Sequence, residues 1–279
     1  MNIQTKACFK KEFLAFFRTN TFLIIACVII GLAILSPALM AGMGALMDAM
    51  SDIYDEMGMD VSDMTAFISE SASMGVAFSI DGIVGTSVIV VLLLLNRTAG
   101  GEQKKRAMII PKSAGLRSFP YIFPKFIIYP LTVFILSVIA ILVSWPISIL
   151  LFNVNDVSFT SVLLIGVLTG VSLMFYVCCH LALGTATGKA GMSAAICITM
   201  SVLFPLVFAS IGTDYMFNPF ALGYLATSVL QWDVIPGSEL LDIAVSVIFA
   251  LGIMLVTYFI ALFAQNARKT DNTGEDLEL

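Results

Sequence analysis

The sequence predicts an all-α integral membrane protein that crosses the bilayer six times. The chain has 279 residues, of which 59% are hydrophobic and 12% are charged, whereas a soluble domain carries roughly 25% charged residues. Its mean hydropathy is +1.00, which suits a hydrocarbon core about 30 Å thick that is crossed by apolar helices of roughly 20 residues. We therefore expect a single transmembrane domain over residues 1–279.

Long charge-free stretches mark the expected spans. Five of them lie between consecutive charged residues, and each is long enough for the roughly 20 residues of a crossing helix. The remaining candidate reaches that length only if Asp81 is counted inside it. The expected spans are residues 21–46, 76–95, 126–152, 158–183, 191–212 and 242–264.

Charge placement predicts the orientation of these spans. With the N-terminus in the cytoplasm, the cytoplasmic segments of the six-span arrangement contain all 14 Lys and Arg residues. Lys and Arg accumulate in short cytoplasmic loops, whereas the net charge, here -5, has little influence on topology. We therefore predict a multi-pass protein of the plasma membrane with both termini in the cytoplasm.

An amphipathic helix is expected before the first span, over residues 5–18. Phenylalanines fall on one side of it and basic residues on the other, a pattern typical of a helix lying in the membrane interface against lipid. The phenylalanines are Phe9, Phe13 and Phe16, and the basic residues are Lys11 and Arg18.

A further uncharged stretch, residues 215–232, is not counted as a span. It contains Asn218 and Pro219, and a crossing there would place Arg268 and Lys269 outside the cell. We expect a re-entrant or interfacial outer loop, since non-helical backbone at membrane depth is tolerated where it is buried in protein or lines a cavity. The polar tail over residues 268–279 is expected to be disordered.

The segment between the second and third spans, residues 96–125, combines a polar helical beginning with a break at Pro111 and a return to the membrane at Lys125. It resembles the intracellular loop of type-2 ATP-binding-cassette exporter permeases, which runs from a Glu through a short helix and a proline to a Lys before the next span. The matching positions here are Glu102, Pro111 and Lys125.

The layout of the rest of the chain is similar to that family as well. Its permeases have six spans, an amphipathic helix before the first span and an Asn-Pro in the last outer loop, as at Asn218 and Pro219. Two features depart from the family pattern. A Gln followed by three basic residues stands where a Gly-Thr often follows the Glu, and the return segment has the extra prolines Pro120 and Pro124.

The resemblance implies a partner and a contact surface. In the family this loop forms a cytoplasmic coupling helix against an ATP-binding subunit, which carries ATP and Mg while the permease is not an enzyme. It also implies a second permease subunit, either another copy or a different chain. The implied ATPase contact residues are Glu102, Lys104, Lys105, Arg106 and Pro111. Alternatively, the basic residues set topology or bind anionic lipid, at about 1 kcal/mol each.

Other chemistries find little support in the sequence. The glycines at 184 and 188 suggest a phosphate loop, but three residues separate them where four are needed, and Ala190 replaces the Ser or Thr that holds magnesium. No Cys or His spacing indicates a metal site, and no disulfide or nucleic-acid partner is expected. His180 is expected to form a hydrogen bond between helices.

Two features within the spans have alternative interpretations. Asp81 is a candidate residue of a transport pathway, because ionisable groups at membrane depth usually face a cavity or the bundle interior; alternatively, it caps a shorter helix. The spacing of Gly166 and Gly170 allows close helix packing, either within the chain or at a dimer seam.

These observations favour the permease subunit of an ATP-driven exporter. A secondary transporter working without an ATPase is the first alternative, and it would rely on intramembrane ionisable residues such as Asp81. A non-transporting immunity or sensor protein on the same scaffold is the second. An intramembrane enzyme would need a constellation of catalytic groups that one His and one Asp do not supply.

Overall fold

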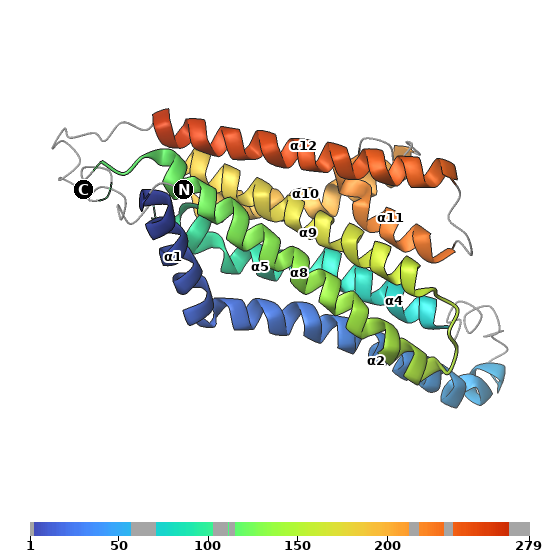
Figure 1. Cartoon of the computed structure of the whole chain (residues 1–279). Helices are drawn as coiled ribbons and strands as arrows, with labels where there is room; N and C mark the ends of the chain where they lie inside the picture. The colour runs from blue at the N-terminus through green and yellow to red at the C-terminus, as the bar shows by residue number, and fades with distance from the viewer. Residues whose placement is uncertain are drawn as a thin grey trace.

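The computed structural model describes residues 3–56, 71–102, 111, 115–211, 218–231 and 237–267, and within these ranges it contains helices and no strands. The helices run side by side, with the start of α1 and the end of α12 at the same end of the bundle (Figure 1). The α-helices are α1 (Ile3–Arg18), α2 (Asn20–Glu56), α4 (Ala72–Asp81), α5 (Val88–Leu94), α8 (Ser118–Phe152), α9 (Phe159–Thr187), α10 (Ala190–Ile211), α11 (Leu222–Ser228) and α12 (Gly237–Ala267). Short irregular helices are the π-helical η1 (Gly82–Ser87) and η2 (Arg97–Gly101) and the 3-10 helices η3 (Pro219–Ala221) and η4 (Val229–Gln231).

Five helical runs are long and apolar enough to cross a membrane. They are Asn20–Leu46, Ala72–Gly101, Ser118–Phe152, Phe159–Thr187 and Glu239–Ala267. In α10 the described apolar stretch, Gly191–Pro205, is shorter than a span. The predicted all-helical membrane protein is thus confirmed in its coarse form, while the sixth crossing stays a prediction.

Two span boundaries differ most from the prediction. The third spanning helix begins at Ser118 and not at residue 126, so that Lys125 lies inside α8. The helix tolerates Pro120 because that residue is in its first turn, where backbone N–H groups have no helical acceptor. The second run extends to Gly101, beyond the expected end at residue 95. Lys125 is tolerated inside the helix because its charge is neutralised by Glu102.

Helix α9 forms the centre of the bundle. In the apolar window of α9, 72% of the residues are buried, compared with 22% for Asn20–Leu46 and 17% for Glu239–Ala267. Helix α9 packs against α8, α10, α11 and α12. Helices α2 and α12 therefore expose most of their apolar surface, as expected of helices at the periphery of a membrane protein.

Small residues let other helices approach α9 closely. A Cβ at Gly170 would lie 2.8 Å from the Phe134 ring, and one at Gly166 would lie 3.4 Å from the Val138 Cα. Both neighbours belong to α8 of the same chain. The structure thus places this glycine pair in the intramolecular seam between α8 and α9, which corrects the alternative that it forms a dimer seam.

The glycines of the phosphate-loop-like sequence also have structural roles. A Cβ at Gly184 would lie 2.7 Å from the Ala99 Cβ and 2.8 Å from the Ala99 carbonyl carbon. Gly188 ends α9 in the left-handed conformation, with φ of 69°, and its N–H donates to the Gly184 carbonyl. This φ value favours glycine because it has no Cβ to clash with the backbone.

Replacing Gly184 with alanine is expected to destabilise the fold by about 1–3 kcal/mol, because the new methyl group meets backbone atoms of Ala99 that cannot move independently. Chemical unfolding in mixed micelles measures the change. Gly252→Ala in α12 is the matched control, since among the described residues nothing beyond the adjoining backbone of α12 lies within 4 Å of its added Cβ, and a gain of up to about 1 kcal/mol is expected there. Equal stability of the two variants would contradict the close approach.

Candidate functional site

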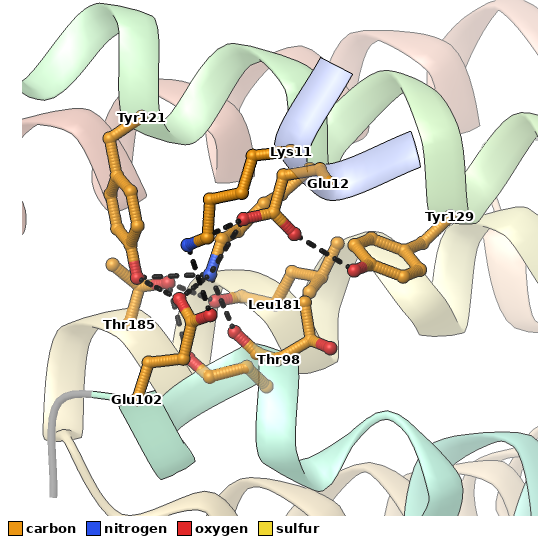
Figure 2. Close-up of polar contacts among 10 residues, drawn as sticks. Lys11, Glu12, Thr98, Glu102, Tyr121, Tyr129, Leu181 and Thr185 are labelled. Carbon is orange, nitrogen blue, oxygen red and sulfur yellow. Dashed lines mark hydrogen bonds and ion pairs between the residues drawn. The ribbon is translucent and has the colours of Figure 1, made fainter. Parts of the chain in front are cut away.

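Lys125 lies inside α8 with only 3% of its side chain exposed. Its Nζ donates hydrogen bonds to Glu102 Oε2 at 2.6 Å, to Tyr121 Oη at 2.9 Å and to the Thr98 carbonyl at 3.2 Å, and these groups converge in Figure 2. An ammonium group has three N–H donors, so three acceptors satisfy it. A carboxylate oxygen of Glu12 lies 4.0 Å from the same nitrogen. Such pairing is what a buried charge requires, since desolvation alone costs several kcal/mol.

Glu102 directly follows η2 and turns its carboxylate toward α8. Its Oε2 accepts the hydrogen bond of Lys125 and a second one from Tyr121 Oη at 2.8 Å, while its Oε1 lies 3.4 Å from Lys11 Nζ. Burial raises the pKa of Glu102. The positive charge and the hydrogen bond of Lys125 lower it, as do the charge of Lys11 and the hydrogen bond of Tyr121. The lowering effects are larger, and the pKa of Glu102 falls to about 2. The carboxylate is therefore ionised at neutral pH.

Helix α1 contributes a second carboxylate to the same place. Its buried side chains are Thr5, Glu12 and Phe16, and Phe9 packs partly buried against the core. These positions recur every three or four residues and form one helix face. Phe13, which the sequence grouped with the other two phenylalanines, lies at the edge of this face and is 45% exposed.

Glu12 holds α1 to α8 through polar and aromatic contacts. Its Oε2 accepts a hydrogen bond from Tyr129 Oη at 2.9 Å, and its Oε1 lies 3.4 Å from Lys11 Nζ. The ring of Phe16 packs edge-on against Tyr129, with ring centroids 4.9 Å apart. Since Tyr129 is one turn beyond Lys125, the two contacts lie side by side along α8.

We call Lys11, Glu12, Glu102, Tyr121 and Lys125 the Lys125 cluster. Its two ammonium groups and two carboxylates balance in charge, and its members come from α1, the end of η2 and the start of α8. A cavity of about 570 Å³ adjoins it, lined in part by all these residues except Lys125. The cluster joins three elements that are separate in sequence. Its charged groups pair with one another, which indicates a structural role.

The structure describes part of the predicted ATPase contact. Glu102 lies in the Lys125 cluster, and the Pro111 carbonyl accepts a hydrogen bond from Leu116 N at 2.9 Å. The three basic positions of that contact lie outside the described residues. They are Lys104, Lys105 and Arg106. Contact with an ATPase therefore stays a prediction, and Glu102 has an internal role that the sequence did not indicate.

Three members of this site were missed by sequence reasoning. Glu12 could have been found, since it lies three residues after Phe9 and four before Phe16, on the same helix face. Tyr121 and Tyr129 lie four residues to either side of Lys125 and so share its face of α8. The sequence contains no signal that these faces meet.

The segment around Asn218 is helical in the described residues. Asn218 caps η3, with its Oδ1 accepting from Phe220 N at 3.0 Å, and Pro219 follows at the first helical position. Asn at the cap and Pro directly after it are both favoured at helix starts. The segment contacts α4, α9, α10 and α12 at the end of the bundle remote from α1. Its re-entry into the membrane stays a prediction.

The structure brings Asp81 and Asn218 to one cavity. This cavity, of about 370 Å³, is lined from α4, η1, α10 and the segment 218–231. We call it the Asp81 cavity, and the members used below are Asp81, Pro205, Asn218, Phe220, Tyr224 and Thr227. Two positions that the sequence singled out for separate reasons thus belong to one site, at the opposite end of the bundle from the Lys125 cluster.

The expected interhelical hydrogen bond of His180 is present. Its Nδ1 lies 3.1 Å from Ser193 Oγ, which joins α9 to α10. Among the residues that the structure describes, no group of three His, Cys, Asp or Glu side chains is placed to hold a metal ion.

Comparison with known proteins found no matching family model, no matching curated protein and no matching solved structure.

Replacing Lys125 with methionine is expected to destabilise the chain by about 3–5 kcal/mol, because it removes the buried cation closest to Glu102 and leaves the two carboxylates with Lys11 alone. Arg117→Met is the control, since it removes an exposed cation from the cap of the same helix and should change stability by no more than about 0.5 kcal/mol. Adding Glu102→Gln to Lys125→Met should cost less than the sum of the single changes. Strict additivity would argue against the pair. Unfolding in mixed micelles gives all four values.

The stability of the protein should fall in acid partly because Glu102 becomes protonated. Its pKa is about 2 when folded and 4.5 as the ordinary value, so its contribution is present above pH 4.5 and is lost as the pH falls from 4.5 toward 2. The expected loss is roughly 3 kcal/mol. Unfolding measured across this range should show a shallower slope for Glu102→Gln than for the natural chain. Identical slopes would contradict the lowered pKa.

Proposed function

We propose that this chain is the permease subunit of an ATP-driven exporter, embedded in the plasma membrane with six spans and both termini in the cytoplasm. A second permease subunit completes the pathway. A separate cytoplasmic ATPase carries ATP and Mg, and this chain performs no covalent chemistry. The observation that carries the proposal is the Lys125 cluster, which ties the segment after the second spanning helix to the third one and to α1.

The distribution of charge supports the proposed orientation. The described Lys and Arg residues lie in α1, around η2, at the start of α8 and between α9 and α10. These elements meet at the end of the bundle that holds the start of α1 and the end of α12 (Figure 1). Basic residues collected at one end indicate the cytoplasmic side.

The length of α10 supports a sixth span. Its 22 residues correspond to about 33 Å at the rise of an α-helix, close to the thickness of the hydrocarbon core. Helix α10 contacts η2 and also η3, elements that lie toward opposite ends of the bundle (Figure 1). Helix α10 is therefore long enough to cross the membrane, even though its described apolar stretch is short.

The Lys125 cluster supports mechanical coupling. In the proposed mechanism the ATPase engages residues 103–114, and nucleotide binding draws this segment toward the partner subunit. Glu102 borders the segment and is bonded to Lys125 of α8, while Lys11 and Glu12 connect the same site to α1. A movement of the segment is then transmitted to α1, α8 and the helical run that ends at η2.

A secondary transporter without an ATPase is the second candidate, and the Asp81 cavity favours it. A carboxylate within a spanning helix and beside a cavity is a common feature of ion-coupled transporters. Both candidates use the same pathway, and they differ in whether a cytoplasmic ATPase drives transport.

Affinity purification of the tagged chain from its native membrane tests the proposal. A cytoplasmic ATPase is expected to co-purify, and Lys104→Glu combined with Arg106→Glu should reduce its recovery by about tenfold or more, since like charges facing each other at an interface cost several kcal/mol. Mass spectrometry and ATP hydrolysis in the eluate measure the recovery.

Lys6→Glu combined with Lys10→Glu is the matched control, because it reverses two exposed charges on α1 without touching the proposed contact. This control should retain the ATPase. Purification without any ATPase would reject the exporter proposal and favour the secondary transporter. Equal loss in both double variants would reject the contact at residues 104–106.

A further inference from the structure

Asp81 is the last residue of α4 and lies within the spanning run Ala72–Gly101. Asp81 is exposed at the surface of the single chain and lines the Asp81 cavity. None of the residues that the structure describes pairs with it, whereas Asp156 at the same end of the bundle accepts two hydrogen bonds from Ser73. A carboxylate at membrane depth is costly and normally pairs with a cation or faces a polar cavity. The geometry therefore leaves one unpaired carboxyl group available to a ligand.

The helix changes its winding at this carboxylate. The π-helical η1 begins at Gly82, directly after Asp81, and π-helical turns inside α-helices occur frequently at functional sites. On the other side of the cavity, Gly223 of α11 faces Val84 of η1, where a Cβ would lie 3.0 Å from a Val84 methyl carbon. This close approach brings the segment 218–231 alongside η1, so that it forms a wall of the cavity.

The remaining walls are mainly apolar and aromatic. Phe220 stacks on Phe204 of α10, with ring centroids 4.6 Å apart, and Pro205 lines the cavity beside them. Tyr224 and Thr227 add hydroxyl oxygens, and the Thr227 hydroxyl donates its proton to the Gly223 carbonyl at 3.2 Å. That hydroxyl oxygen can therefore accept a hydrogen bond from a ligand.

These features select a class of ligand. A single carboxylate attracts a cation and repels anions. Ca²⁺ would require six to eight oxygen ligands, whereas the described lining offers side-chain oxygens from four residues, Asp81, Asn218, Tyr224 and Thr227. Aromatic rings bind organic cations through their faces. At about 370 Å³, the cavity is in the range of sites for small organic molecules.

We propose that the Asp81 cavity binds a monovalent organic cation, with an ammonium group on the Asp81 carboxylate and an apolar body against Phe220 and Tyr224. As a site for transported substrate this rests on the proposed function, whereas binding itself can be measured on the purified chain without an ATPase. The site lies at the end of the bundle opposite the Lys125 cluster, where an exported molecule would leave.

Binding of phenethylammonium to the full chain in lipid nanodiscs tests this inference, with neutral phenylpropanol, which is one carbon longer, as the uncharged comparison ligand. Calorimetry should show the ammonium binding at least about tenfold more tightly than the alcohol. Asp81→Asn should abolish this preference, and Asp81→Glu should retain it. Asp156→Asn, which removes a charge from the same end but outside the cavity, should also retain it.

A second measurement on the natural chain avoids any effect of substitution on folding. An apolar carbodiimide should modify Asp81, as located by peptide mass spectrometry, and phenethylammonium should protect it while phenylpropanol does not. Equal binding of the two ligands, absence of protection, or a preference that survives Asp81→Asn would overturn the site. Complete displacement by Na⁺ at equal concentration would overturn the organic class of ligand.

The two proposals fail separately. Co-purification of an ATPase with a chain that does not bind phenethylammonium would reject the cation site and leave the exporter intact. Binding by a chain that never recovers an ATPase would reject the exporter and leave the cation site intact.

Discussion

The arrangement of this protein depends on one buried ammonium group. Lys125 is placed within a long apolar helix, where an unpaired charge would be very costly, and it is stable there only because carboxylates from two other elements reach it. This requirement brings α1 and the end of η2 to the start of α8. It also fixes the rotation of α1, since Glu12 must face α8 together with Phe16. The ion pairs of the Lys125 cluster therefore decide how three segments meet that could otherwise pack in many ways.

Small residues on α9 set how closely the neighbouring helices approach it. Apolar packing has no preferred direction, and in a lipid environment the association of helices relies on close van der Waals contact. Gly166 and Gly170 admit α8, while Gly184 admits the η2 turn beside Ala99. The η2 turn is thereby held next to α9, and Glu102 emerges from it within reach of Lys125. Glycine packing and ion pairing thus support each other at the same end of the bundle.

The two sites are connected by a single helical run. From Ala72 to Gly101 the chain forms one nearly continuous helical run, interrupted by a turn at Leu95, with Asp81 toward one end and Glu102 just beyond the other. About 30 Å of helix separates them at the usual rise per residue. The π-helical segments η1 and η2 lie next to these two residues. In the proposed exporter, a displacement of Glu102 along the helix axis moves the backbone that carries Asp81, which links the cytoplasmic segment to the outer cavity.

The sequence by itself determined the helical membrane character of the protein and the approximate position of five spanning runs. It could do so because hydrocarbon solvent imposes long apolar stretches that are local in sequence. It also singled out Glu102, Lys125, Asp81 and Asn218. Only the tertiary structure decided that Glu102 binds Lys125, that Glu12 joins them, and that Asp81 and Asn218 share a cavity. These pairings depend on the rotation and depth of whole helices, which follow from packing between distant segments and leave no local pattern in the chain.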